Sequence, residues 1–117
     1  MKENIVKLKS FDFALRIVKI YQYMTEKKEF ILNKQLLRSG TSIGALIRES
    51  EHAESKVDFV HKLSIALKEA NESQYWIELL YKSNYLAHIA AIRTKVGVVV
   101  EFQFFLVPVC VLRIFVL

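Results

Sequence analysis

The 117-residue sequence contains little glycine, proline or cysteine, and these scarcities exclude several classes of protein. Its glycines are Gly40, Gly44 and Gly97, and its one proline is Pro108. Because the chain before Pro108 contains no helix-breaking proline, a turn-rich β fold is disfavoured. With Cys110 as the one cysteine, no disulfide can form within the chain. A chain of this length is predicted to form one domain.

The formal net charge of +5 is concentrated in the first half of the chain. Residues 1–48 contain ten Lys or Arg against four Asp or Glu, a balance of +6, whereas residues 49–95 contain six against seven, a balance of −1. A basic half can attract phosphate backbones or another anionic surface, and it can equally serve solubility alone. The residues that we expect to contact phosphates are Arg16, Lys19, Lys27, Lys28, Lys34 and Arg38.

Hydrophobic periodicity predicts a first helix from Ser10 or Asp12 to about Glu26. The residues that we expect to face inward from it are Phe11, Ala14, Ile17, Val18, Tyr21 and Met24. A second helix is predicted to begin at Asn33, a favourable N-cap, and to end near His52. Its inward residues are expected to be Leu36, Leu37, Gly40, Ile43, Gly44 and Ile47.

Gly40 and Gly44 lie in the small-residue centre of this second helix. Each glycine costs roughly 1 kcal/mol of helix propensity relative to alanine. We therefore expect the close approach of a neighbouring helix to offset that cost. A phosphate-binding glycine loop is the alternative, but no Lys-Ser or Lys-Thr pair follows the glycines and no predicted strand precedes them.

A third helix is predicted from Ser55 to about Asn84, with Ser55 and Asp58 forming a variant of the capping box. Steps of four and three along it are typical of the packing seam in coiled coils and bundles. The seam consists of Phe59, Leu63, Ala66, Ala70, Ser73, Ile77, Leu80 and Asn84. Together the three helices predict an all-α protein, an antiparallel up-down bundle of the four-helix type.

A second stripe of the third helix carries Ile65, Glu69, Glu72 and Trp76. Carboxylates flanked by apolar residues favour partial burial against a basic partner, since acidic groups are rarely buried unpaired. Arg38 and Arg48 of the second helix are the candidate partners, so a structural polar network is one interpretation. A solvated acidic face is the other.

Two acid-x-x-His pairs raise the question of a metal site: Glu49 with His52, and Asp58 with His61. Di-iron bundles use such pairs on two helices together with further glutamates. Here the nearest additional glutamates lie two to four turns further along the third helix, so we expect capping and surface ion pairs instead. No metal or other cofactor is predicted.

Catalysis is not predicted either, because no nucleophile lies beside a candidate base. Cys110 lies in the most apolar stretch, where a thiol is expected to be inert. The hydroxyls of Ser39, Thr41 and Ser42 have no histidine that the sequence places next to them. We therefore expect a protein that is not an enzyme.

The last part of the chain differs from the rest. Residues 96–117 are rich in valine and phenylalanine and lack a helical period, so we expect a bundle domain over residues 1–95 followed by an apolar segment. Eleven uncharged residues separate Glu101 from Arg113, fewer than the roughly 20 that a membrane-spanning helix needs. A tail anchor is the alternative to packing against the bundle. Because the first residues also lack the pattern of a signal peptide, we expect a cytoplasmic protein.

Two stretches of the sequence resemble a known family. They are RSGTSIGALIRESEHAESK, which begins at Arg38, and FVHKLSIALKEANESQYWIELL, which begins at Phe59. Both are similar to the four-helix bundle proteins named after the intervening sequences of bacterial 23S ribosomal RNA genes. The similarity extends from about Phe11 to Tyr85.

The resemblance implies an antiparallel four-helix bundle that assembles into a ring-like homo-oligomer, commonly a pentamer. A similar bundle serves as the accessory protein of diversity-generating retroelements, where a basic surface contacts nucleic acid and a reverse transcriptase. No catalytic activity is implied, and an association with RNA is inferred for the family from genomic context. The sequence departs from the family at residues 96–117, where relatives continue into a fourth amphipathic helix.

Two functions therefore remain open: a basic oligomeric bundle that associates with ribosomal RNA or another structured nucleic acid, and a structural protein-interaction scaffold without nucleic-acid binding. Membrane association is not expected.

Overall fold

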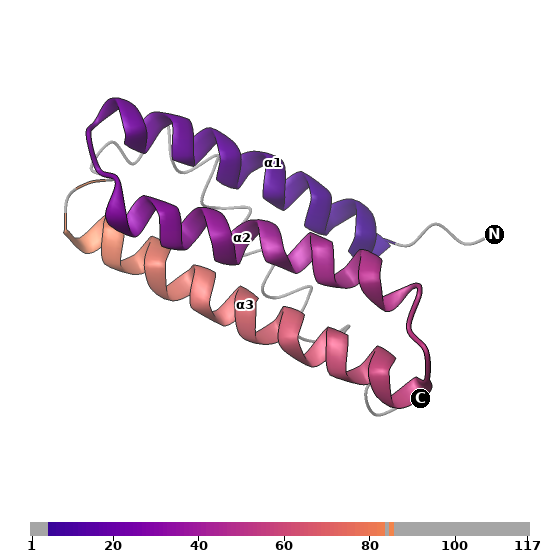
Figure 1. The fold of residues 1–117 in the computed structure, drawn as a ribbon. Helices are drawn as coiled ribbons and strands as arrows, with labels where there is room; N and C mark the ends of the chain where they lie inside the picture. The colour runs from indigo at the N-terminus through magenta and orange to yellow at the C-terminus, as the bar shows by residue number, and fades with distance from the viewer. Residues whose placement is uncertain (1–4, 84, 86–117) are drawn as a thin grey trace.

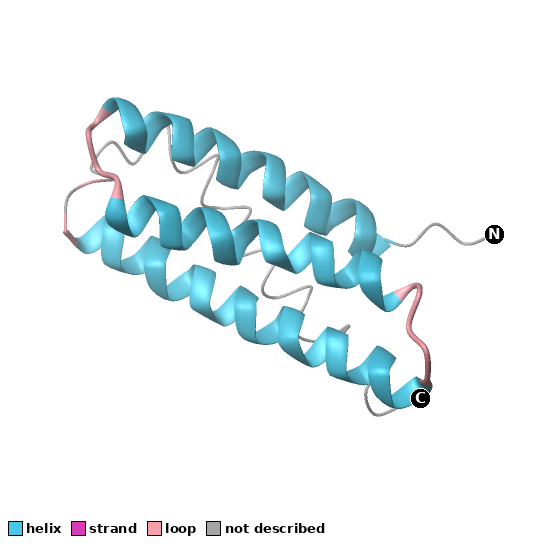
Figure 2. Ribbon diagram, viewed as in Figure 1, coloured by secondary structure: helices cyan, strands magenta, loops and turns pink. Residues whose placement is uncertain are grey.

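The computed structural model describes residues 5–83 and 85, which form three helices. These are α1 (Ile5–Glu26), α2 (Ile31–Ser50) and α3 (Lys56–Lys82). α2 lies between α1 and α3 and contacts both (Figure 1). Short connections join the helices, and the described part of the chain contains no strand (Figure 2). The all-α prediction is confirmed for these residues, whereas the predicted fourth helix and the apolar segment 96–117 lie outside them.

α2 and α3 bury most of the seam residues that the sequence predicts, and Leu37 and Phe59 are partly buried. On α2 the buried apolar residues are Leu36, Ile43 and Ile47, and Gly40 and Gly44 are buried beside them. On α3 the buried residues are Leu63, Ala66, Ala70, Ser73, Ile77 and Leu80. Ser55 caps α3 as predicted, because the Asp58 backbone N–H donates to its hydroxyl at 3.0 Å. The second half of the predicted capping box is different, since the Asp58 carboxylate accepts the backbone N–H of Glu54 and not that of Ser55. The predicted end of this helix at Asn84 lies outside the described residues.

The inward face predicted for the first helix is partly wrong. The helix begins at Ile5, earlier than predicted, and buries a stripe at steps of four and three: Val6, Ser10, Phe13, Ile17, Ile20 and Met24. Phe11 and Val18, which we expected to face inward, are 48% and 38% exposed. The prediction failed because α1 carries two apolar stripes, and periodicity alone does not tell which one meets α2.

The predicted N-cap of the second helix is also wrong. α2 begins at Ile31, and the Glu29 carboxylate accepts the backbone N–H groups of Leu32 at 3.1 Å and Asn33 at 2.7 Å. A carboxylate is favourable here because the first N–H groups of a helix lack partners and carry its positive dipole end. The Asn33 amide is thereby available to donate to the Tyr21 carbonyl of α1 at 3.0 Å.

Each connection reverses the chain, so that residues far apart in sequence lie side by side. Asn33 contacts Tyr21, and Gly44 lies against the Ser10 backbone. On the other side of α2, Ser39 meets Ser73. The end of α1, the start of α2 and the end of α3 therefore share one end of the structure (Figure 1). None of the helices in this described region is long and apolar enough to cross a membrane.

Candidate nucleic-acid interface

Three of the predicted phosphate contacts lie close together at the connection between α1 and α2. Lys27 and Lys28 follow the last turn of α1, and Lys34 lies in the first turns of α2. All three side chains are exposed. The Lys27 ammonium also lies 5.6 Å from the centroid of the Tyr23 ring, within the range of a cation–π contact. This end of the structure therefore presents cations beside an aromatic ring.

Lys28 adopts a backbone conformation that usually belongs to glycine. Its φ is +63°, and it is the one non-glycine residue with positive φ in the described part of the chain. The Lys28 N–H donates to the Thr25 carbonyl and the Glu29 N–H to the Met24 carbonyl, the bonding pattern of a Schellman motif. A side chain in this conformation costs about 1–2 kcal/mol. A lysine therefore occupies a position where glycine would be more stable.

Arg16 and Lys19 lie on the same side of α1 as Lys27. At about 100° per residue, the three positions fall within about 80° of one another around the helix. Arg16 is half-buried and Lys19 is exposed. These residues form a basic stripe that leads along α1 toward the connection with α2.

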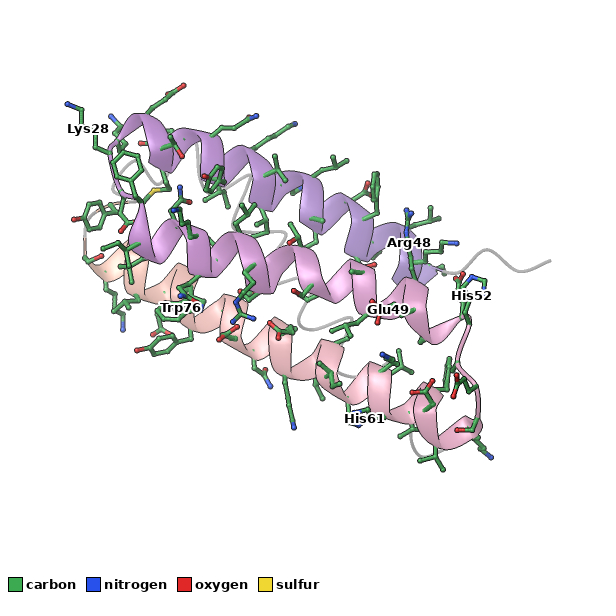
Figure 3. The ribbon with its side chains drawn as sticks, viewed as in Figure 1. Lys28, Arg48, Glu49, His52, His61 and Trp76 are labelled. Atoms are coloured by element: carbon green, nitrogen blue, oxygen red, sulfur yellow. The ribbon has the colours of Figure 1, made fainter. Side chains whose placement is uncertain are left out.

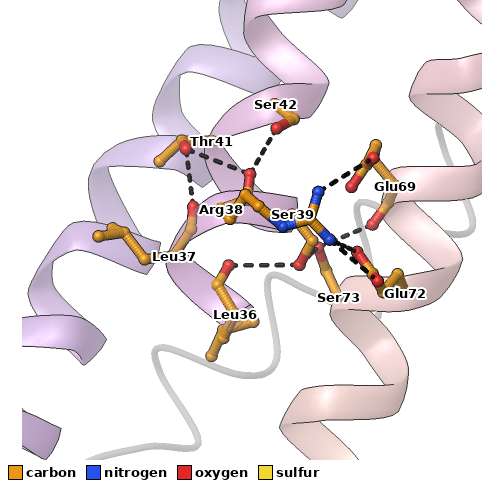
Figure 4. A network of polar contacts seen from close by, with 9 residues as sticks. All are labelled: Leu36, Leu37, Arg38, Ser39, Thr41, Ser42, Glu69, Glu72 and Ser73. Carbon is orange, nitrogen blue, oxygen red and sulfur yellow. Dashed lines mark hydrogen bonds and ion pairs between the residues drawn. The ribbon is translucent and has the colours of Figure 1, made fainter. Parts of the chain in front are cut away.

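Arg38, the sixth predicted contact, is engaged in a polar network between α2 and α3 (Figure 4). Its Nη2 atom donates to both carboxylate oxygens of Glu72, at 3.1 and 2.9 Å, and its Nη1 atom lies 3.8 Å from Oε1 of Glu69. Two carboxylates therefore neutralise this guanidinium, and Arg38 contributes less than the lysines to an anion-binding surface.

The same network includes a buried hydrogen bond across the helix interface. The hydroxyl oxygens of Ser39 and Ser73 lie 2.9 Å apart, and both residues are fully buried. Serine and alanine on these seams allow the two helices to approach closely. The sequence placed Ser73 on the seam but gave no sign that Ser39 would be its partner.

Burial raises the pKa of the Glu69 carboxyl above its ordinary value. The neighbouring Glu72 carboxylate adds to the rise, and the Arg38 guanidinium opposes it. One oxygen of Glu69, Oε2, is buried and has no hydrogen-bond partner among the described residues, and the same is true of Nε1 of Trp76, one turn beyond Glu72. The predicted half-buried acidic stripe is thus present, with Arg38 as its basic partner.

Arg48, the other predicted partner of the acidic stripe, lies elsewhere. Its guanidinium carbon is 5.2 Å from the ring centroid of Phe11 on α1, near the opposite end of α2 from Lys28 (Figure 3). The prediction failed for Arg48 because it lies ten residues, nearly three turns, beyond Arg38. In the register in which Ser39 meets Ser73, it is level with about Ser64 of α3, more than one turn away from Glu69.

Gly40 and Gly44 lie at the contact between α2 and α1. A Cβ atom added at Gly40 would stand 2.7 Å from Cγ1 and 2.9 Å from Cγ2 of Ile17. At Gly44 the nearest atom would be the Ser10 carbonyl oxygen, at 3.4 Å. The first glycine faces a fixed side chain at very short range, whereas the second has room for a methyl group.

The acid-x-x-His pairs occupy the end of the structure opposite Lys28 (Figure 3). Glu49 pairs with Lys62 at 3.2 Å, and the Asp58 carboxylate accepts the Glu54 backbone N–H at 3.2 Å. Within residues 5–83 and 85, no three His, Cys, Asp or Glu side chains come together as a metal site would require. These carboxylates act in ion pairing and capping.

The three packed helices of the described residues place the chain among the helical bundle proteins. Comparison with known proteins identifies its family. The model of the 23S rRNA-intervening sequence protein family matches residues 2–97, so the chain belongs to that family.

A crystal structure from Bacteroides thetaiotaomicron is similar to the chain. It is described as a protein with unknown function from the S23 ribosomal protein family, and it is 48% identical with a TM-score of 0.81. The similarity covers 91% of this chain and 98% of that one. Among curated proteins, no match was found.

Proposed function

We propose that the protein is a non-catalytic, oligomeric bundle of the antiparallel four-helix type that associates in the cytoplasm with RNA or a ribonucleoprotein. The observation that carries this proposal is the exposed basic surface of α1 and its connection to α2. Its lysines are Lys19, Lys27, Lys28 and Lys34. The name of the family refers to a sequence of ribosomal RNA, which agrees with a phosphate-rich partner.

Binding through lysines to phosphates is salt-sensitive and nearly independent of sequence, because its energy comes largely from the release of counterions. A filter-binding titration of a structured RNA at low and high salt tests the proposal. The double variant Lys27→Glu/Lys34→Glu is expected to weaken binding roughly tenfold at low salt. The matched control Lys56→Glu/Lys68→Glu makes the same change in net charge on exposed residues of α3 and is expected to bind as the wild type does.

Failure of the wild type to bind at low salt would reject the proposal. So would an equal loss of affinity in both double variants, because the loss would then follow net charge and not this surface.

Homo-oligomerisation, the second part of the proposal, is supported by an exposed apolar stripe of α1 that is separate from its buried stripe. Its residues are Leu8, Phe11, Leu15 and Val18, which are 49, 48, 47 and 38% exposed. Each lies two positions from a buried residue, about 200° around the helix. Their steps of three, four and three are typical of a second helix-packing seam.

The alternative function, a scaffold that positions another protein without binding nucleic acid, rests on the same stripe. Light scattering, combined with the RNA titration, distinguishes the RNA-binding bundle from the scaffold. Leu15→Glu is expected to reduce the molecular mass of the assembly, whereas Val57→Glu, on a side chain that is 79% exposed on α3, is expected to leave it unchanged. Stable oligomers that do not bind RNA at low salt would favour the scaffold function.

A further inference from the structure

Exposed aromatic side chains gather at the same end of the structure as the lysines of the α1–α2 connection. Phe30 precedes α2 and is 52% exposed, and Tyr81 and Tyr85 at the end of α3 are 43% and 45% exposed. The other exposed aromatic residues of the described chain, Phe11 and Tyr75, lie on helix faces further along α1 and α3. Single exposed apolar residues are common, whereas apolar surface that gathers in one place indicates an interaction site.

The register of α2 and α3 places these rings level with the lysines. Ser39 meets Ser73, and the two helices run in opposite directions from that contact. Tyr81 lies eight residues after Ser73, and Ile31 lies eight residues before Ser39, so both stand at the same height. Tyr85 lies beyond, at the height of the α1–α2 connection, and its N–H donates to the carbonyl of the fully buried Leu80.

The charges at this end favour an anionic partner. Lys27, Lys28 and Lys34 are exposed. The Glu29 carboxylate is 8% exposed and is occupied by two backbone N–H groups of α2, so it opposes an approaching anion little. The other carboxylates at this end are Glu26, which is exposed, and Glu78, which is paired with Lys82 at 3.2 Å, so the lysines remain in excess.

The backbone conformation of Lys28 also indicates a functional site at this end of the structure. Glycine would relieve the positive φ at this exposed position, yet a long cation occupies it. Strained residues persist where the surrounding structure holds them, and they concentrate at functional sites. The strained backbone of Lys28 therefore indicates that its side chain has a function, at the centre of the cluster of Lys27, Lys28 and Lys34.

We propose that this end of the structure binds unpaired nucleotides of RNA, with bases stacking on Phe30, Tyr81 and Tyr85 and phosphates lying against Lys27, Lys28 and Lys34. Aromatic rings interleaved with cations form the usual surface for single-stranded nucleic acid, because every base presents a face that can stack. The bases of a duplex are already stacked on each other, so a duplex can use the lysines and not the rings. The inference rests on the proposed association with RNA and specifies its ligand as an unpaired strand.

Fluorescence anisotropy with a labelled RNA strand of about 16 nucleotides, alone and annealed to its complement, tests the inference. The single strand is expected to bind at least about fivefold more tightly than the duplex. Phe30→Ala and Tyr85→Ala are each expected to lose about fivefold or more for the single strand and little for the duplex. Tyr85→Phe, which keeps the ring, is expected to retain the affinity. Tyr75→Ala, on another exposed tyrosine of α3, is expected to bind as the wild type does.

The possible failures are distinguishable. If both RNAs bind equally and the alanine variants bind like the wild type, the stacking site is wrong while the charge-based association stands. If neither RNA binds at low salt, the proposed function fails and this site with it. A loss in Tyr75→Ala equal to that in Tyr85→Ala would contradict the location. Melting curves of each variant by circular dichroism show whether the helices remain folded, and the exposed positions predict that they do.

Discussion

Replacing Gly40 by alanine should destabilise the protein, although alanine is the better helix former. The added Cβ would stand 2.7 Å and 2.9 Å from the two γ carbons of Ile17 and 3.1 Å from its δ carbon. Ile17 is 1% exposed, so it cannot move into solvent. As a β-branched residue in a helix, it is also largely confined to one χ1 rotamer. The clash therefore has to be relieved by moving α1 away from α2.

The size of the effect follows from two opposing terms. Alanine recovers roughly 1 kcal/mol of helix propensity, whereas overpacking a well-packed core costs about 1–3 kcal/mol. Since both γ carbons are too close, we take the upper part of that range and expect a net loss of about 1–2 kcal/mol. For a domain of this size the loss corresponds to a fall in Tm of roughly 5–10 °C.

Gly44→Ala is the matched control, because it makes the same substitution one turn away on the same helix. Its new Cβ would meet the Ser10 carbonyl oxygen at 3.4 Å, an ordinary van der Waals distance. We expect it to be neutral or to stabilise the protein by up to about 1 kcal/mol.

Urea denaturation followed by circular dichroism, at one fixed protein concentration, measures both variants. Ile17→Ala removes the atoms with which the new Cβ collides, so in that background Gly40→Ala should become neutral or stabilising. Equal and favourable effects of Gly40→Ala and Gly44→Ala in the wild-type background would show that the contact with Ile17 imposes no constraint on residue 40.

Three further predictions concern single side chains. Because burial raises the pKa of Glu69, ionisation of this carboxyl favours the unfolded state. The free energy of unfolding should therefore fall as the pH rises from the ordinary pKa of a glutamate through the raised pKa of Glu69. Urea titrations at several pH values should show this fall for the wild type and not for Glu69→Gln. Lys28→Gly should raise the unfolding free energy by about 0.5–1 kcal/mol, which is the relief of positive φ less the entropic cost of glycine; no gain would mean that the φ of +63° is unstrained. Ser55→Ala should lower thermal stability by about 1 kcal/mol through loss of the α3 cap, whereas Ser64→Ala, whose hydroxyl bonds within its own helix, should have no such effect.

The sequence predicted α2 and α3 well because each carries one clear apolar seam bounded by polar residues. The α3 cap was also predictable, since Ser55 and Asp58 stand at the spacing that satisfies the first N–H groups of a helix. For α1 the sequence offered two seams, and the choice between them depends on which one α2 covers. The start of α2 was missed because Glu29, two residues ahead of the helix, caps it in place of Asn33.

The candidate site was less predictable than the fold. The lysines were visible as a charge excess, but their gathering at one end depends on how the helices reverse. Pairing of Arg38 with Glu72 was open to prediction from the acidic stripe, whereas the choice of Arg38 over Arg48 depends on the register of α2 against α3. The exposure of Phe30 and Tyr85 had no signal in the periodic pattern, because both lie outside the helices.

Measuring the salt dependence of RNA affinity for the wild type and for Lys28→Gln shows whether lysines of the α1–α2 connection contact phosphates. The logarithm of the binding constant should fall linearly with the logarithm of salt concentration, and the slope should become shallower by about 0.7 when one phosphate contact to a single strand is removed. An affinity that does not change with salt, or a slope that is the same with and without the Lys28 charge, would mean that this surface does not bind RNA phosphates.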